Sequence, residues 1–382
     1  MTITIPPSPA SYTITASGTT ASNAGTRSQF TAGQPVGIYL QGSNDVLVNT
    51  GTIIGGYFST NGTGLIAGVA VNTATGDSVT NQMNGLIENT YSIAAGIVFY
   101  DATGAVTNAG TIIGGVGAPG GSGNGIDLDA GGSVTNLATG TISGGGVYTG
   151  TRGGTGTVTN SGKILGDSVY GGVFLAVGGT VTNLAGTIAA NGAAYGIRIA
   201  GGAGTVTNAA TITGGSAGGT AITLAAVADN RVIDQYGGVF IGTVNGGSGA
   251  AMELTSSASA GTLTATGGQF TNFSALYIDT GARWTIQGDG GLSTEFPVIG
   301  GFTAGDTISL TGLAQTPTTF SSSTAVNSGT TTTSVIIKAG STSLETLTLL
   351  GSIASSSLIV ETASTVSTSI IAVLPLSRSI AP

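Results

Sequence analysis

Apolar and polar residues alternate over short stretches of this chain, and the stretches return at intervals of 23 to 32 residues. One of them is an apolar–any–apolar triplet with a variable middle position. This period of two indicates β-strands, which point successive side chains to opposite faces. Copies lie at 38–40, 69–71, 97–99, 126–128, 173–175, 197–199, 222–224, 252–254 and 276–278, with a degenerate copy near Val147.

A second phrase, Val-Thr-Asn, alternates with the triplet and is followed by small residues and a Thr-Ile pair. It reads SVTNLATGTISGG from Ser133 and TVTNAATITGG from Thr205. No stretch shows a helical period, so each repeat is predicted to hold three short strands joined by glycine-rich corners. Three strands in about 25 residues, stacked on copies of themselves, form one rung of a solenoid. We therefore predict an all-β fold, a parallel β-solenoid of about ten rungs with a small C-terminal β-domain.

The asparagine of the phrase recurs at one place in successive rungs, with Asp234 as its last stand-in. Asparagine suits tight corners, and its amide can bond to an identical amide one rung away. We interpret the series as a structural ladder rather than a ligand site: Asn49, Asn81, Asn108, Asn136, Asn160, Asn183 and Asn208. Two apolar ladders are expected inside the coil: Ile142, Ile164, Ile188 and Ile212, and Val134, Val158, Val181 and Val206.

The repeats divide the chain into three predicted parts. Residues 1–30, which contain Pro6, Pro7 and Pro9, are expected to cap the coil or to exchange a strand with a neighbour. Residues 31–295 form the solenoid. Residues 296–382 read as five or six alternating strands, and we expect a β-sandwich-like domain that serves as a cap, an assembly module or an export signal.

The VTN and GTI phrases resemble those of repeat-rich bacterial surface proteins whose β-helical stalks are similar to autotransporter passenger domains. The segment FTAGDTISLTGL from Phe302, followed by Leu347-Thr-Leu-Leu-Gly351, resembles the C-terminal β-module of such proteins. The resemblance implies a secreted or cell-surface bacterial protein. We do not expect an outer-membrane barrel from residues 296–382, which departs from the autotransporter pattern. The N-terminus, MTITIPPSPASYTIT, has no basic stretch before an apolar run, so we expect export without a classical signal peptide.

Composition narrows the candidate functions. Only 6% of the residues are charged, with 8 Lys and Arg against 16 Asp and Glu, so no basic stripe exists for a nucleic acid. The longest apolar run near the C-terminus, 370–376, is too short for membrane insertion. Histidine and cysteine are absent, which excludes triads and thiolate or imidazole metal sites. We expect no enzyme activity. The alternative is a polysaccharide-active enzyme that would use Asp279 and Glu295 as its catalytic carboxylates. These two residues belong to a charged cluster with Arg283 and Asp289, and we interpret this cluster as a solvated junction between the solenoid and the C-terminal domain.

Calcium is the one metal that the sequence raises. The segment 120–129 approaches the calcium-binding nonapeptide of secreted β-rolls, but it is off register and occurs once. We interpret Asp127 and Asp129 as outward strand residues and keep them as the calcium candidates. No other cofactor is expected. Outward aromatic side chains such as Tyr39, Phe174 and Tyr277 would form a contact strip for protein or glycan if they shared a face.

Two functions remain open at this point. The first is a structural extracellular protein whose rods associate head to tail with copies of themselves into a fibre, matrix or layer. The second is a cell-surface adhesin whose β-helical stalk binds glycan or matrix through its loops, among them 55–64 and 114–125.

Overall fold

The computed structural model describes residues 1–8, 11–28, 36–56, 66–72, 75–91, 93–115, 123–150, 152–168, 171–192, 194–215, 218–314, 319–353, 358–363 and 368–373. It is an all-β parallel β-solenoid of about 11 turns, with small sheet pieces near the C-terminus, as the repeats predict. The chain divides into two compact units. The first comprises Met1–Ala225 and Val239–Gly242, and the second comprises Ala226–Gly238 and Thr243–Pro382.

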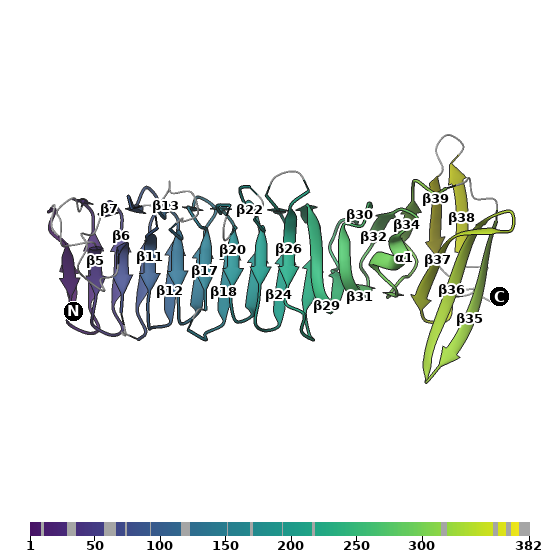
Figure 1. The fold of residues 1–382 in the computed structure, drawn as a ribbon, viewed down its shortest axis with the longest axis horizontal. Coiled ribbons are helices and arrows are strands. Elements are labelled where there is room, and N and C mark those ends of the chain that lie inside the picture. The colour runs from purple at the N-terminus through teal and green to yellow at the C-terminus, as the bar shows by residue number, and fades with distance from the viewer. Residues whose placement is uncertain are drawn as a thin grey trace, which may run out of the picture. The chain divides into compact units, whose positions relative to one another are not determined.

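Each turn of the first unit contributes a strand to each of three faces, so the strands of one face follow one another along the stack (Figure 1). The triplets form the first face. Its strands are β2 (Tyr12–Ile14), β5 (Val36–Leu40), β8 (Ala67–Val71), β11 (Ala95–Phe99), β14 (Ile126–Leu128), β17 (Val147–Thr149), β20 (Val173–Leu175), β23 (Ile197–Ile199) and β26 (Thr220–Leu224). All neighbours pair in parallel.

The Val-Thr-Asn phrases form the second face, again with parallel neighbours. Its strands are β1 (Thr2–Thr4), β3 (Thr20–Asn23), β6 (Val46–Asn49), β9 (Ser78–Asn81), β12 (Gly104–Asn108), β15 (Gly132–Asn136), β18 (Gly156–Asn160), β21 (Gly179–Asn183) and β24 (Gly204–Asn208). Identical phrases stack without a register shift, so Val134 pairs with Val158 and Val158 with Val181.

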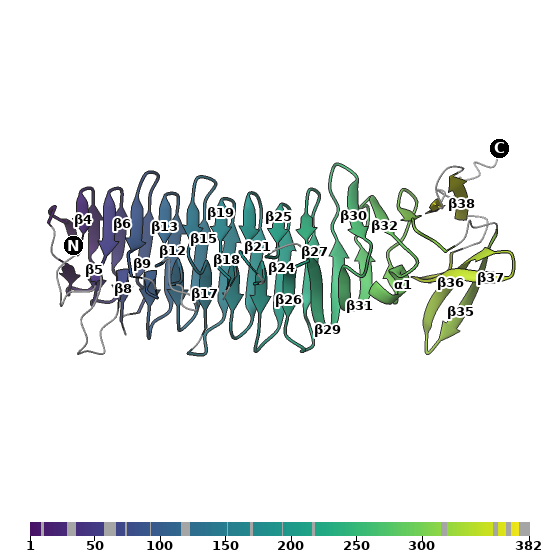
Figure 2. The ribbon, with the colours of Figure 1, turned by 45° about the horizontal axis from the view of Figure 1, so that its top comes forward.

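The Thr-Ile strands form the third face as a nine-stranded parallel sheet (Figure 2). They are β4 (Thr26–Ser28), β7 (Thr52–Gly55), β10 (Leu86–Asn89), β13 (Thr111–Ile113), β16 (Thr141–Ser143), β19 (Lys163–Leu165), β22 (Thr187–Ala189), β25 (Thr211–Thr213) and β28 (Val239–Ile241). Both predicted apolar ladders lie inside the coil. Their isoleucines and valines are at most 1% exposed, which confirms the alternation read from the sequence.

The solenoid begins earlier than the predicted boundary at residue 31. Strands β1, β3 and β4 lie within residues 1–30 and pair in parallel, and Asn23 takes the ladder position of the first complete turn. Residues 5–7 then cross the end of the third face: Ile5 N–H donates to Ser22 O at 2.8 Å, and Pro7 lies against Gly25. The described part of the N-terminal segment is therefore integral to the coil.

The second unit contains parallel coil strands of its own and then changes to antiparallel pairing. Its coil strands are β27 (Arg231–Asp234), β29 (Thr243–Leu254), β30 (Gly261–Ala265), β31 (Phe270–Ile278), β32 (Trp284–Gly288), β33 (Ile299–Gly300) and β34 (Thr307–Leu310). The later strands are β35 (Thr319–Asn327), β36 (Thr330–Ala339), β37 (Thr342–Leu350), β38 (Leu358–Ala363) and β39 (Thr368–Val373). One helix, α1 (Leu292–Glu295), was not expected from the sequence.

Two sequence assignments change in this unit. Segments 252–254 and 276–278 look like triplets of the first face, but Met252 pairs with Val232 of β27 and Leu276 pairs with Met252. They therefore stack on the strand that ends at Asp234. Parallel pairing also passes residue 296, because β33 pairs with β31 and β34 with β32. Antiparallel partners cover the coil only after β34, which pairs with β39.

Candidate functional site

The ladder asparagines are completely buried at one corner of the first unit. Each member from Asn49 to Asn183 donates from Nδ2 to Oδ1 of the next member, with N–O distances of 2.8–2.9 Å, whereas Asn208 donates to Val239 O at 3.3 Å. The series predicted from Asn49 to Asn208 is present, and Asn23 extends it by one member, since it donates to Asn49 at 2.8 Å. With these amides bonded to one another inside the coil, the series is a structural element.

A second corner series was missed by the sequence reasoning. Asp45 Oδ1 accepts a hydrogen bond from the N–H of Thr19 at 2.8 Å, and Asp77 Oδ1 accepts one from the N–H of Asp45 at 2.8 Å. Both carboxylates are buried, and burial raises the pKa of Asp77. An aspartate directly before the Val-Thr-Asn strand was the available signal, since a carboxylate there can accept a backbone N–H of the turn below.

The calcium candidates lie on the outer side of the first face. Asp127 is the middle residue of β14, in register with Val98 and Tyr148 on the neighbouring turns, and Asp129 follows β14. Asn124 Nδ2 donates to Asp127 Oδ2 at 3.1 Å. Burial, and secondarily the charge of Asp129, raises the pKa of Asp127 to about 7. The two carboxyl groups therefore sit close enough to influence each other.

Asp129 belongs to a cluster of charged and aromatic side chains that spans three turns. Arg152 Nη1 lies 2.7 Å from Asp101 Oδ1, and Arg152 Nε lies 3.9 Å from Asp129 Oδ2. The Arg152 guanidinium stacks over the Tyr100 ring, 3.9 Å from its centroid. The arginine thus joins residues that are 23 to 52 positions away in the chain, which local sequence patterns do not reveal.

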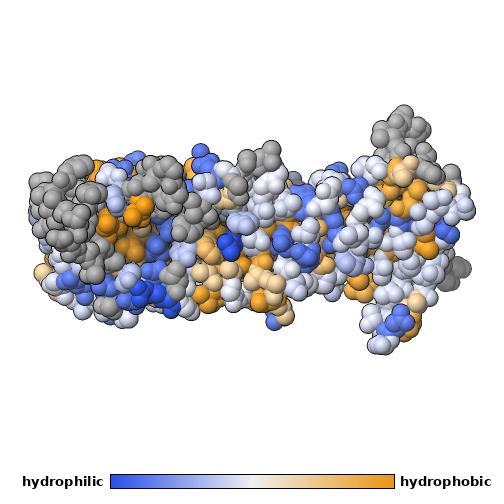
Figure 3. Space-filling view, in the orientation of Figure 1, coloured by the Kyte–Doolittle hydropathy of each residue, from blue (hydrophilic) through white to orange (hydrophobic). Residues whose placement is uncertain are grey.

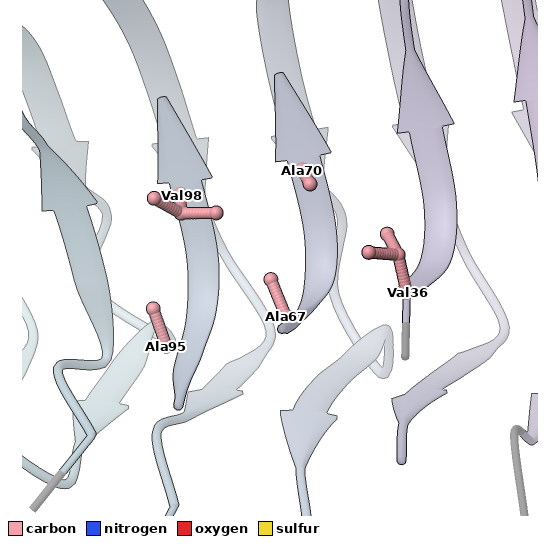
Figure 4. Close-up of a cluster of buried hydrophobic side chains, with 5 residues drawn as sticks. All are labelled: Val36, Ala67, Ala70, Ala95 and Val98. Carbon is pink, nitrogen blue, oxygen red and sulfur yellow. The ribbon is translucent and has the colours of Figure 1, made fainter. Parts of the chain in front are cut away.

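Beside this cluster the surface is hollowed over about 290 Å³. The hollow is lined by Ile66, Ile93, Ala94, Ala95, Val98, Tyr100, Asp127 and Asp129. Its floor continues into a buried apolar cluster on the outer side of the first face, formed by Val36, Ala67, Ala70, Ala95 and Val98, whose side chains lie across three neighbouring strands (Figure 4). Alternation predicts that the middle residues of these triplets face solvent, whereas Ala70 is fully buried and Val98 is 8% exposed.

Aromatic side chains continue along the same face. Tyr148 and Phe174 occupy equivalent positions on successive turns, and their rings meet edge to face at 4.9 Å between centroids. Arg198, the next residue in register, places its guanidinium 4.9 Å from the Phe174 centroid and 5.6 Å from that of Tyr195. We call Tyr148, Phe174, Arg198 and Tyr195 the aromatic strip. Of the aromatics expected to share a face, Phe174 lies in the strip and Tyr39 packs on the apolar cluster. Tyr277 does not join them, because it lies exposed on β31 of the second unit, in register with Glu253.

The acidic cluster near the predicted junction is brought together only in part: the charge of Asp289 acts on Glu295, whereas that of Asp279 acts on Arg231. Asp289 accepts hydrogen bonds from the N–H groups of Gly267 and Gly291, at 2.7 and 2.9 Å. Glu295 is only 3% exposed, so the interpretation of a wholly solvated junction is wrong for this residue. Burial raises the pKa of Glu295 to about 7. Asp279 contributes to the electrostatic environment of Arg231, whose guanidinium bonds to Glu253 at 2.5 and 2.7 Å.

Within the described ranges, no three acidic side chains come close enough to share a metal ion. In the same ranges, no helix is long and apolar enough to cross a lipid bilayer. The chain matches no model of a known protein family, and neither the curated proteins nor the solved structures contain a significant match to it.

Proposed function

We propose that this chain is a structural extracellular protein whose copies associate through the ends of their solenoids. The observation that carries this proposal is the one-sided pairing of β1 and β2 within the described residues. Strand β1 pairs with β3 and strand β2 pairs with β5, and neither has a second partner among the described residues. Unpaired edges of this kind bind further strands.

The geometry indicates which backbone groups would make the joint. Met1 O and Ile5 N–H bond toward β3, so the intervening Thr4 points its N–H away from that strand. Ile14 O accepts from Gln41 N–H on the β5 side, so Thr13 N–H points outward in the same way. The third face offers no such edge, because residues 5–7 with their two prolines cross it. A joint would therefore use two faces of three.

Secretion and a bacterial cell surface belong to the same proposal. They rest on the VTN and GTI phrases, on the low content of charged residues and on the absence of cysteine. A stiff coil with few charges suits a fibre, matrix or layer, because identical rods with two different ends form contacts that propagate without closing.

The proposal is tested by imaging and sedimentation of the purified chain over a range of concentrations. We expect oligomers or fibres in negative-stain micrographs, and their loss in Thr4→Pro and Thr13→Pro, which remove outward N–H groups and leave the ladders to β3 and β5 intact. Thr4→Ala and Thr13→Ala remove the same side chains, keep the N–H groups and should assemble like the parent. Monomers at every concentration, pH and calcium level would refute the proposal.

A second candidate, an adhesin that binds glycan or matrix, is favoured by the aromatic strip. Aromatic faces beside a guanidinium form a common sugar-binding arrangement, because C–H groups stack on the ring while the cation bonds to hydroxyl or acidic groups. Most residues of the two loops that the sequence nominated, 55–64 and 114–125, lie outside the described residues, which omit 57–65 and 116–122. Binding to a glycan panel should fall in Phe174→Ala and Arg198→Ala, and it should persist in Tyr236→Ala, which removes an exposed tyrosine of the second unit.

A further inference from the structure

The outward side chains of the second face form a regular array. Its phrase buries the valine and the asparagine and points the residues on either side of the valine away from the coil. The position directly before the asparagine holds threonine on every turn from β9 to β24: Thr80, Thr107, Thr135, Thr159, Thr182 and Thr207. The position two residues earlier holds a hydroxyl group on every one of these turns but that of Ala105: Ser78, Ala105, Ser133, Thr157, Thr180 and Thr205. We call these two columns the threonine face.

The backbone sets the spacing of the threonine face in two directions. The strands from β9 to β24 pair in parallel without a register shift and stand side by side along the stack (Figure 1). Neighbouring strands lie about 4.8 Å apart, and two residues along a strand span about 6.6 Å. Branching at Cβ restricts the rotamers of threonine, so its hydroxyl and methyl groups are held in place. The side chains therefore form a stiff two-dimensional grid.

The threonine face is uncharged, and its hydroxyl groups are available to an outside partner. None of its positions holds an acidic or basic residue, although the chain carries a net charge of −8. Among the described residues, no threonine hydroxyl of this face has a hydrogen-bond partner. Each hydroxyl can donate one hydrogen bond and accept two, and the methyl group beside it restricts the orientation of the water that it cannot bond. The grid can thus order a layer of water.

The other surfaces of the coil lack this regularity. On the first face, the outward positions hold side chains as different as Asp127, Phe174 and Arg198. On the third face, Glu88 and Lys163 interrupt the outward series with charges. The space-filling view shows an apolar area over the strands near the N-terminus, with hydrophilic areas next to it (Figure 3). A repeating ligand surface would therefore find a repeating partner on the second face.

We propose that the threonine face binds ice. Its two spacings are close to the oxygen repeats along the two axes of an ice prism face, so water that is bonded to the hydroxyl groups occupies positions that continue into the crystal. Each contact is weak, and many equal contacts in register are needed to hold a solid surface. A sugar polymer fits less well, because sugar rings stack on aromatic side chains, and the threonine face consists of threonine, serine and alanine. The proposal does not depend on self-association, since this face lies on the side of the coil.

Ice binding can be measured on the purified full-length chain in two ways. In the first, ice grows slowly on a cooled probe in a dilute solution of the protein, and the protein content of the ice is compared with that of the remaining liquid. In the second, a single ice crystal is observed under the microscope just below its melting point. We expect the chain to be enriched in the ice and to give faceted crystals that stop growing over a measurable temperature interval.

Thr182→Lys places a charged, flexible side chain in the middle of the threonine face and should abolish both effects. Thr187→Lys is the matched control, because Thr187 lies on the third face of the same turn, in register with the natural Lys163. This variant should bind ice like the parent. Circular dichroism shows whether both variants fold. If Thr182→Lys does not, the pair Thr135→Lys and Thr141→Lys repeats the comparison, since Thr141 also lies in register with Lys163.

Several results would overturn the proposal. Exclusion of the parent chain from growing ice, with round crystals that grow freely, would do so without any variant. Equal losses in folded Thr182→Lys and Thr187→Lys would show that the threonine face is not the binding surface. Binding to crystalline cellulose or chitin that Thr182→Lys abolishes, with no effect of the parent on ice, would assign this face to a polysaccharide instead.

Discussion

Asn136 donates from Nδ2 to Oδ1 of Asn160 at 2.8 Å, although the two residues are 24 positions apart in the chain. Asn160 in turn donates to Asn183 at 2.9 Å, so each amide between the two end members is both donor and acceptor in a continuous buried series. Such a series resembles the asparagine ladders of cross-β assemblies, except that here one chain supplies every member.

Replacing one ladder member should therefore cost more than the loss of a single bond. In Asn160→Ala, Asn136 loses its acceptor and Asn183 loses its donor, and both groups remain buried. We expect the free energy of unfolding to fall by about 2 kcal/mol or more, measured by urea titration followed by circular dichroism. Thr159→Ala, which removes an outward side chain of the same strand, should change stability by less than about 1 kcal/mol. Equal losses in the two variants would contradict a structural role for the ladder.

Asp234 should make the stability depend on pH. This carboxyl group is 1% exposed, and burial raises its pKa to about 8, despite the nearby N–H of Gln235. A pKa that is higher in the folded than in the unfolded state favours folding of the protonated form. The contribution is complete below about pH 4 and is lost as the pH rises toward 8.

Asp234→Asn removes this dependence, because an amide needs no proton to remain neutral. We expect the variant to be more stable than the parent at pH 8, by about 2 kcal/mol, and to match it near pH 4. Thermal unfolding of the parent and the variant at several pH values measures the difference in stability at pH 8 and its disappearance near pH 4. A stabilisation that stays constant from pH 4 to pH 8 would show that titration of Asp234 is not its cause.

Gly179 and Gly153 illustrate two different reasons why a corner of the coil requires glycine. Both have positive φ, +135° and +102°. A Cβ on Gly179 would meet the backbone oxygen of Gly156 at 2.1 Å, whereas one on Gly153 would have open space. Gly153→Ala should cost about 1 kcal/mol from backbone strain alone, and Gly179→Ala about 3 kcal/mol or more, because the neighbouring turn must also move. Similar unfolding midpoints for the two variants would rule out close stacking at Gly179.

Pro7 should limit self-association if copies join through the first turn. It lies against Gly25, and Arg27 Nη2 donates to the preceding carbonyl, Pro6 O. Pro7→Ser restores an N–H at the end of the third face and should raise the sedimenting fraction at a given protein concentration. Ser8→Ala provides a control one residue away. An unchanged or lower sedimenting fraction in Pro7→Ser would show that this proline does not protect the edge.

Local alternation is an incomplete guide in parts of this fold. Met252-Glu253-Leu254 has the same apolar–any–apolar form as Ile222-Thr223-Leu224, yet it stacks on Val232-Ile233-Asp234. A period of two identifies a strand and the side chains that point into the coil. A triplet of three residues, however, does not specify to which face of the coil the strand belongs. In the region of exact phrase repetition, identical neighbours remove this ambiguity, which is why Val134, Val158 and Val181 align as predicted.

The sequence by itself determined the coil, its three strands per turn and its inner ladders, because short-range alternation repeated at a fixed period can bury its apolar side only by stacking. It also identified the asparagine ladder, since equal positions in equal turns must become neighbours. Tertiary structure alone decided what lies outside the coil. Arg152 reaches Asp101 across two turns, and Asp127 is enclosed by residues from other turns. Those contacts are made by corners that differ in sequence and length from turn to turn, so the repeat period of the sequence does not predict them.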